Sequence, residues 1–354
     1  MAYDFIPTST NDIVKTISDK VISEELVLAL MRLHKKFPNI KDPLAIDPKA
    51  PRIAKVTRKL QESLNIKELQ SPFKRIKLEF GEGSRGGRGT ANKGNAFEDE
   101  LAKDFDRWWE TGKVSVPMNE KFIKGVVSEY KIDKWKDLFV DAEGALNKPR
   151  PLIVSDNSVI VSPGLVDIGA VVTDITLRKG KDKKAEAGVY LSLKYSGTVT
   201  FFNAGTKKYL TDAELKAGLV KNKGGVALLN MFGLDNIMFC SVFNGKGKNF
   251  KSVDTTKKVN IRILEDLIKS GIGYGYHMVH KLGQEIISKP VTKAYRDNAS
   301  KVKKVTVFYG GKTGTGKRVD IEVLTPTYVL KFNFRNKQGG NYISHLMCDY
   351  SYVK

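Results

Sequence analysis

Two β-rich segments near the middle of the chain, 171–177 and 188–195, are separated by a short basic stretch. Both are rich in residues that favour strands, and the polar connection predicts a hairpin between them. Because side chains alternate along a strand, Asp174 in the first segment can share a face of the sheet with Ser192 and Lys194 in the second. The opposite, predicted core face of the second segment carries Val189, Leu191, Leu193 and Tyr195. The pattern predicts that a carboxylate and an ammonium group meet on neighbouring strands.

The charge of the chain is its strongest bulk property. Its 354 residues include 60 Lys and Arg against 39 Asp and Glu, which gives a net charge of +21. Such a chain attracts polyanions over long range, so nucleic acid is the expected partner, with DNA placed ahead of RNA. A basic surface that only aids solubility is the alternative. No basic amphipathic helix with an apolar face stands out, so a membrane partner is not expected. Assembly into a homo-oligomer is left open.

Cysteine usage and the N-terminal sequence bear on the compartment. The two cysteines, Cys240 and Cys348, are too few for a disulfide framework, and their apolar surroundings predict buried free thiols. The first residues lack a basic segment followed by an apolar run, and no stretch approaches 18 apolar residues. We therefore expect an intracellular location, in the cytoplasm or in a host cytoplasm for a viral protein, and no secretion.

Composition divides the chain into three parts. Residues 1–80 are expected to form a helical N-terminal region, because their apolar residues recur mostly at spacings of three and four. Residues 81–94 are rich in Gly and Arg and predict a linker or loop. Residues 95–354 are expected to form one α/β domain with a helical insertion at 225–300.

Periodicity places the elements of this domain. A helix is predicted from Asn95 to about Trp109, with Glu98 beside its buried stripe. Three further helices are predicted, at 211–219, 226–232 and 261–269. Other strands are predicted at 152–154, 158–161, 198–202, 303–309, 319–324, 328–335 and 342–352.

The order of these features resembles the PD-(D/E)xK, or restriction-endonuclease-like, nuclease superfamily. A helix with Glu98 is followed by a strand with Asp174, a hairpin, and a strand with Ser192-Leu193-Lys194. The resemblance implies a mixed β-sheet core flanked by helices, here with a helical N-terminal region and a β-rich C-terminal part. It also implies that Asp174 binds Mg²⁺ or Mn²⁺, with the backbone carbonyl of Leu193 and the accessory acid Glu98. Lys194 would position the attacking water.

The sequence departs from this family at position 192, where Ser192 replaces the acidic residue of the triplet. A hydroxyl is a weak ligand for a hard cation. Either another acid substitutes, with Glu98 and Glu186 as candidates, or metal binding is weak, or the site is inactive. The favoured function is a metal-dependent deoxyribonuclease. The alternatives are a non-catalytic nucleic-acid-binding protein on a degenerate nuclease fold and a basic structural protein of the kind found in virions.

Basic residues in three places are candidates for binding nucleic acid. They are Arg85, Arg88 and Lys93 in the linker, Lys181, Lys183 and Lys184 in the hairpin, and Lys207 and Lys208 after the 198–202 strand. Each group could hold phosphates, although a solvated surface is the ordinary explanation for a single lysine.

Two other patterns resemble known binding sites, a phosphate loop and a histidine metal site, but each lacks a residue that the site requires. Residues 311–318 approach a phosphate-loop pattern, but Arg318 stands where a hydroxyl is needed, and the flanking segments predict strands. We interpret them as the turn of a basic hairpin. His277 and His280 would share a face if they were helical, but no third metal ligand is recognisable, so packing is the preferred interpretation.

Overall fold

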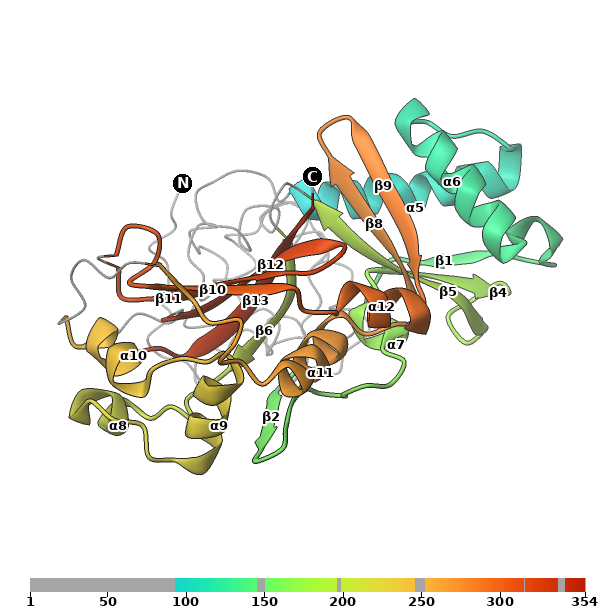
Figure 1. Cartoon of the computed structure of the whole chain (residues 1–354). Coiled ribbons are helices and arrows are strands. Elements are labelled where there is room, and N and C mark those ends of the chain that lie inside the picture. Colours follow the sequence, from blue (N-terminus) through green and yellow to red (C-terminus); the bar gives the residue numbers. More distant parts are fainter. Residues whose placement is uncertain are drawn as a thin grey trace, which may run out of the picture. The chain divides into compact units, whose positions relative to one another are not determined.

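A computed structural model describes residues 93–144, 150–195, 199–245, 252–314, 316–336 and 341–353. The predicted helical region 1–80 and nearly all of the predicted linker lie outside this set. Residues Glu98–Lys354 form one compact unit of mixed α/β structure with several sheets (Figure 1). The α/β class is therefore confirmed.

The first sheet has five strands in the order β1-β4-β5-β8-β9. Its strands are β1 (Phe139–Asp141), β4 (Ile175–Lys179), β5 (Glu186–Tyr195), β8 (Tyr276–Leu282) and β9 (Glu285–Val291). Strands β1, β4 and β5 are antiparallel neighbours, β5 and β8 run parallel, and β9 returns antiparallel to β8. The sheet is thus mixed, and the predicted hairpin is the β4–β5 connection at its centre.

The second sheet is antiparallel throughout, in the order β6-β13-β12-β11-β10-β7. Its strands are β6 (Val199–Gly205), β7 (Ser252–Asp254), β10 (Lys304–Tyr309), β11 (Val319–Leu324), β12 (Tyr328–Arg335) and β13 (His345–Tyr352). Two further strands, β2 (Leu152–Ser155) and β3 (Ser158–Val161), form a separate hairpin. The predicted closing strands of the C-terminal part are confirmed, and residues 311–314 and 316–318 lie in the connection between the antiparallel strands β10 and β11, as the hairpin prediction requires.

The helices of the described residues are α5 (Lys93–Thr111), α6 (Pro117–Tyr130), α7 (Gly169–Val172), α8 (Asp212–Ala217), α9 (Lys223–Met231), α10 (Asn236–Phe243), α11 (Ile261–Ile272) and α12 (Lys293–Ala299), with a 3-10 turn at Ile132–Lys134. The start of α8 is fixed by a capping bond, in which the Thr211 hydroxyl accepts the Glu214 N–H. No single helix among the described residues is long and apolar enough to cross a membrane; one bent pair, α9 and α10, passes by length and composition only.

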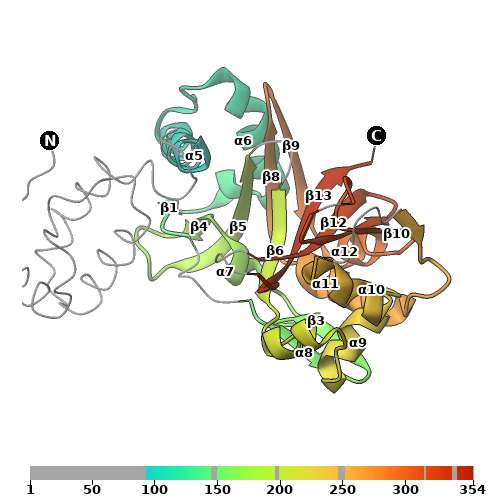
Figure 2. The same cartoon turned by 90° about the vertical axis from the view of Figure 1, so that its left-hand side faces the viewer.

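The first sheet is covered on both faces (Figure 2). On one side lie α5 and α6: the ring of Phe122 in α6 packs at 6.3 Å from that of His277 in β8, and Glu100 in α5 reaches Lys281. On the other side lies the second sheet, where the Tyr350 hydroxyl contacts the sulfur of Met278 at 3.2 Å. Residues of the first sheet that share the His277 face are apolar and buried, namely Ile175, Leu177, Val189, Leu191, Leu193 and Val279.

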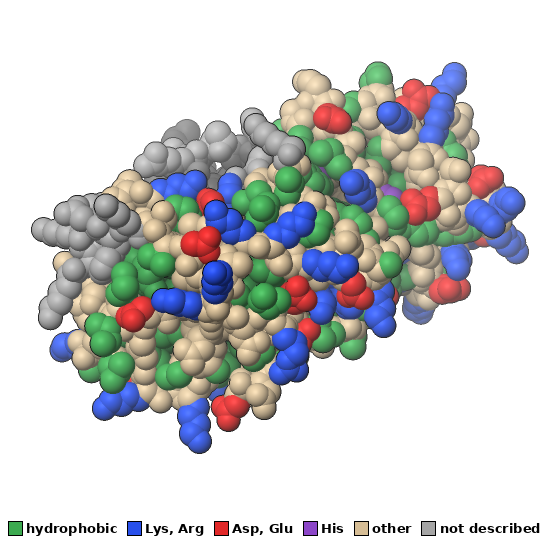
Figure 3. Space-filling view, viewed as in Figure 1, with side chains coloured by type: hydrophobic (Ala, Val, Ile, Leu, Met, Phe, Trp, Pro, Cys, Tyr) green, Lys and Arg blue, Asp and Glu red, His purple; other side chains and the backbone are tan. Residues whose placement is uncertain are grey.

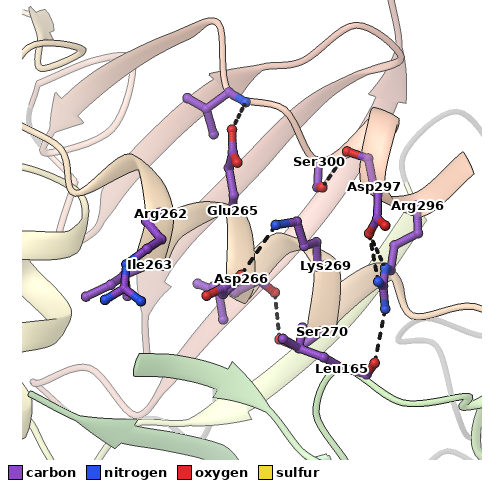
Figure 4. A network of polar contacts seen from close by, with 12 residues as sticks. Leu165, Arg262, Ile263, Glu265, Asp266, Lys269, Ser270, Arg296, Asp297 and Ser300 are labelled. Atoms are coloured by element: carbon purple, nitrogen blue, oxygen red, sulfur yellow. Dashed lines mark hydrogen bonds and ion pairs between the residues drawn. The ribbon is translucent and has the colours of Figure 1, made fainter. Parts of the chain in front are cut away.

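A polar network fixes the segment that leads into α7 (Figure 4). The Arg296 guanidinium in α12 donates to the Leu165 carbonyl at 3.2 Å and pairs with Asp297. The carboxylate of Asp167 accepts the Gly169 N–H at 2.8 Å at the start of α7. The Arg296 contact links this segment to α12 a few residues before Asp174.

Two sequence-based expectations are wrong in detail. The strand predicted at 171–177 is split, because residues Gly169–Val172 form the short helix α7 and β4 begins only at Ile175. The predicted helical insertion at 225–300 contains α9, α10, α11 and α12 but also β8 and β9, and β8 is an interior strand of the first sheet. The first five residues of β8, Tyr276–His280, are buried on both faces of the sheet, so they lack the alternation of buried and exposed positions that identifies a strand in a sequence.

Candidate active site

Asp174 sits at the junction between α7 and β4. Its N–H donates to the Leu191 carbonyl at 2.8 Å, so the residue already pairs with β5 although it precedes the strand. The neighbouring Thr173 hydroxyl donates to the Ile175 carbonyl at 2.7 Å and is buried. The junction is therefore fixed by hydrogen bonds on both sides of Asp174.

Asp174, Ser192 and Lys194 lie on one face of the first sheet, as alternation predicts. The pairing of Ile175 with Leu191 puts Asp174 opposite Ser192, and Lys194 follows two residues later. One oxygen of the Asp174 carboxylate accepts the Leu193 N–H at 2.6 Å. These are the predicted site residues that the structure brings together.

Electrostatics at Asp174 reflect both burial and these neighbours. Burial raises the pKa of the Asp174 carboxyl, while the positive charge of Lys194 and hydrogen bonds from the Leu193 N–H and the Ser192 side chain act in the opposite direction. The burial contribution is the largest. Because burial makes the ionised form of Asp174 unfavourable, a cation bound to its carboxylate would stabilise that form.

The backbone carbonyl of Leu193 is directed to the same side of β5 as its N–H, towards Asp174. Within a strand, the N–H and C=O of one residue are directed to the same neighbouring strand. Since the Leu193 N–H donates to Asp174, its carbonyl is directed to the β4 side as well. The two oxygen groups expected to bind a metal thus belong to one small region.

The two acids considered as substitutes for position 192 lie elsewhere. Glu186 begins β5, six residues before Ser192, and pairs with Lys179 at 3.2 Å. Glu98 belongs to α5, and the neighbouring Glu100 reaches Lys281 on the opposite face of the sheet from Asp174. Glu186 thus lies at the hairpin end of β5, away from Ser192, and Glu98 lies on the helix that covers the face of the sheet opposite to Asp174.

The oxygen groups present fit a hard divalent cation only in part. Asp174 and the Leu193 carbonyl are suitable in kind, since Mg²⁺ is commonly held by one or two carboxylates, with water and phosphate completing its shell. Within the described ranges, no group of three or more His, Cys, Asp or Glu side chains is arranged to hold a metal ion. The protein itself would supply few ligands.

The hairpin lysines face acids of the preceding segment. Lys181 lies 3.9 Å from Asp137, and Lys183 pairs with Glu143. Lys184 is exposed, and its backbone N–H donates to Asp182 at 2.7 Å. Part of the positive charge expected here is therefore compensated locally.

The other candidate phosphate-binding residues are not gathered at Asp174. Lys207 and Lys208 follow the seven-residue strand β6, where Lys207 pairs with Asp212 and Lys208 lies over the Tyr209 ring. Arg85 and Arg88 are outside the described residues, as is the side chain of Lys93. On the face in Figure 3, Lys and Arg side chains are spread among acidic ones and form no single stripe.

The two central histidines lie on opposite faces of β8. His277 contacts the Tyr130 hydroxyl at 3.2 Å and Ser288 on the α6 side, whereas the His280 ring packs against Tyr350 on the other side. Register pairs His280 with Lys194 across β5 and β8. A metal bridging the two histidines is thus excluded by the strand geometry.

No family model, no curated protein and no solved structure matches this chain. The function must therefore be argued from the geometry of the site.

Proposed function

We propose that this protein is a metal-dependent nuclease that hydrolyses phosphodiester bonds of DNA at a site formed by Asp174, Leu193 and Lys194. The observation that carries the proposal is the hydrogen bond between the Asp174 carboxylate and the Leu193 N–H, with Lys194 on the same face. This arrangement places the carboxylate of Asp174 and the ammonium group of Lys194 on neighbouring segments of a mixed sheet. A restriction-endonuclease-like core is part of the proposal, supported by the order α5, β1, β4, β5, then α11 and the parallel strand β8.

Each residue has a distinct role in this proposal. Asp174 and the Leu193 carbonyl would hold Mg²⁺ or Mn²⁺, which polarises the scissile phosphate and lowers the pKa of the attacking water. The Lys194 ammonium orients that water and stabilises the negative charge that develops on phosphate oxygens. The Ser192 side chain, opposite Asp174, favours the ionised form of that carboxylate, and the Leu193 N–H holds it in place by a hydrogen bond. The net charge of +21 supports a polyanionic substrate.

Cleavage of supercoiled plasmid tests the proposal. We expect nicking with Mg²⁺ or Mn²⁺, none with EDTA, and a rate about 10²–10³-fold lower for Lys194→Ala, the usual cost of removing one charge-stabilising group. Lys289→Ala is the matched control, because Lys289 is an exposed lysine of the same sheet on the edge strand β9. Nicking that survives EDTA, or that is unchanged in Lys194→Ala, contradicts the proposal.

Non-catalytic binding of nucleic acid is the second candidate, and position 192 favours it. Ser192 is 1% exposed and offers a neutral hydroxyl where a second carboxylate would strengthen cation binding. This candidate predicts retention of DNA that weakens steeply with salt, without any nicking at all. The same plasmid, run with and without Mn²⁺, separates the two functions.

A further inference from the structure

A serine and a histidine form a close pair on the face of the first sheet that α6 covers. The Ser288 hydroxyl of β9 hydrogen-bonds to Nε2 of His277 in β8. His277 is 2% exposed, whereas Ser288 is half-buried on β9, a strand at the edge of the sheet. The pair lies on the opposite face from Asp174, so it is separate from the proposed nuclease site.

The end of α6 contacts the other ring nitrogen of His277. The Tyr130 hydroxyl lies 3.2 Å from Nδ1, and a carboxylate oxygen of Glu129 lies 3.8 Å from the same atom. The negative carboxylate favours a proton on Nδ1, and the Tyr130 oxygen can accept that N–H. Burial lowers the pKa of His277 to about 4, so the ring is neutral at pH 7. Nε2 is then unprotonated and can accept the proton of the Ser288 hydroxyl.

The edge position of β9 supplies a backbone N–H beside the Ser288 hydroxyl. A two-residue turn that begins with Gly283, at a φ of 61°, joins β8 to β9, so Leu282 and Glu285 are the hydrogen-bonded closing pair of this hairpin. Hydrogen-bonded and non-hydrogen-bonded pairs alternate along an antiparallel ladder, and the pair of Val279 with Ser288 is of the second kind. The Ser288 N–H is therefore directed away from β8, to the outer edge of the sheet.

The neighbours of Ser288 along this face of β9 are apolar. Ile286 and Pro290 are two positions away on either side, so they share the face of Ser288, and both are half-buried. A charged group placed against them would lose water without gaining a partner. An apolar group is therefore the better occupant of the space beside the Ser288 hydroxyl.

We propose that Ser288 and His277 form a second catalytic centre, which hydrolyses esters with an apolar acyl group. Nε2 of His277 takes the hydroxyl proton as the Ser288 oxygen bonds to the ester carbonyl carbon, and the Ser288 N–H stabilises the oxyanion. The C–O bond to the alcohol then breaks, and the departing oxygen takes the proton from Nε2. Glu129 is a positioning residue, because it keeps the proton of the resting ring on Nδ1.

Water completes the reaction at the same atoms. It gives a proton to Nε2 of His277 as its oxygen bonds to the acyl carbon. The bond from that carbon to the Ser288 oxygen then breaks, and this oxygen takes the proton back. The products are the carboxylic acid and the free hydroxyl, so no oxidant, reductant or metal is consumed.

Labelling of the full-length protein with an alkyl fluorophosphonate tests this centre, because attack by the Ser288 oxygen on phosphorus expels fluoride and leaves a stable adduct. We expect peptide mass spectrometry to place the adduct on Ser288, and Ser288→Ala to have none. His277→Gln should lower the labelling rate about 10²–10⁴-fold, the usual contribution of a general base. Ser252→Ala is the matched control, because Ser252 is an exposed serine on β7, an edge strand of the second sheet, and it should label like the wild type.

Two further variants distinguish chemistry from a structural role. Glu129→Gln should lower the maximal labelling rate constant without changing the reagent concentration that gives half of it, and Glu129→Asp should recover part of the rate. Ser288→Cys keeps a nucleophile at the site, and its alkylation by iodoacetamide should slow when His277→Gln is added. Thermal melting of each variant checks that the fold is kept.

The outcomes that overturn the proposal are specific. They are a wild type without an adduct on Ser288, an adduct that forms as fast in His277→Gln, and equal alkylation of Ser288→Cys with and without His277. A wild type that is labelled on Ser288 but releases no nitrophenol from p-nitrophenyl butyrate would also overturn ester hydrolysis. Plasmid nicking is measured separately, so failure of this centre leaves the nuclease proposal standing.

Discussion

One face of the second sheet and the Asp174 face of the first sheet bury different kinds of side chain. The buried face of the second sheet is aromatic and aliphatic, with Phe332 and Phe334 both in edge contacts with Phe232. The first sheet buries Thr176 and Ser192 on the face where Asp174 and Lys194 project. Burying polar groups costs free energy unless they are hydrogen-bonded, and the buried Thr176 hydroxyl does contact that of Thr173 at 3.3 Å. The difference suggests a scaffold in one sheet and chemistry in the other.

The largest effect that follows from this difference concerns Asp174→Asn. Burial raises the pKa of the Asp174 carboxyl, so at neutral pH its ionised form lowers the free energy of unfolding, and that penalty is removed as the pH falls through the carboxyl range. The neutral amide can still accept the Leu193 N–H. We therefore expect the variant to lose plasmid nicking and to melt at a higher temperature than the wild type at pH 7. A variant that loses nicking and melts earlier would instead make Asp174 a structural residue.

A substitution in the second sheet should lower stability without changing the rate of plasmid nicking. Phe332 is fully buried and packs against Phe202 and Phe232 at ring distances of 6.1 and 5.1 Å. Phe332→Ala should lower the free energy of unfolding by about 3–5 kcal/mol, through lost burial and the cavity left behind. Below its melting temperature the variant should nick plasmid at the wild-type rate. Urea unfolding and the nicking assay measure the two quantities, and a specific loss of nicking would remove the distinction between the sheets.

Local patterns in the sequence predicted most of the second sheet and the centre of the first. Alternation is a property of neighbouring residues, so the common face of Asp174, Ser192 and Lys194 and the four closing strands follow from it. Strand β8 was missed because a short segment buried on both faces has no alternation of buried and exposed positions that separates a strand from a helix. Strand β1 was missed for another reason: its place beside β4 depends on a register between segments more than thirty residues apart, which no local pattern encodes.

The α6 side of the first sheet offers a smaller, pH-dependent test. Burial lowers the pKa of His277 to about 4, although Glu129 lies 3.8 Å from its ring nitrogen, because that carboxylate is itself largely exposed to water. In the unfolded chain this histidine has an ordinary pKa of about 6.5. Between the two pKa values the unfolded chain therefore binds a proton that the folded protein does not bind. Stability should therefore fall by about 2 kcal/mol between pH 7 and pH 5 from this residue alone. His277→Gln should flatten the pH dependence of urea unfolding by that amount; equal slopes would show that His277 is protonated in the folded protein.

The smallest expected effect compares the basic turns of the two sheets. Lys184 in the β4–β5 hairpin is exposed and has no carboxylate partner among the described residues, whereas Lys312 in the β10–β11 turn pairs with Glu322 at 3.2 Å. If nucleic acid lies along the first sheet, Lys184→Ala should reduce the slope of log affinity against log salt by about 1, the value for one lost phosphate contact. Lys312→Ala should leave the slope unchanged. Fluorescence anisotropy with a duplex oligonucleotide over a salt series measures both, and an equal loss in Lys312→Ala would extend the nucleic-acid surface to the second sheet and end its description as a scaffold alone.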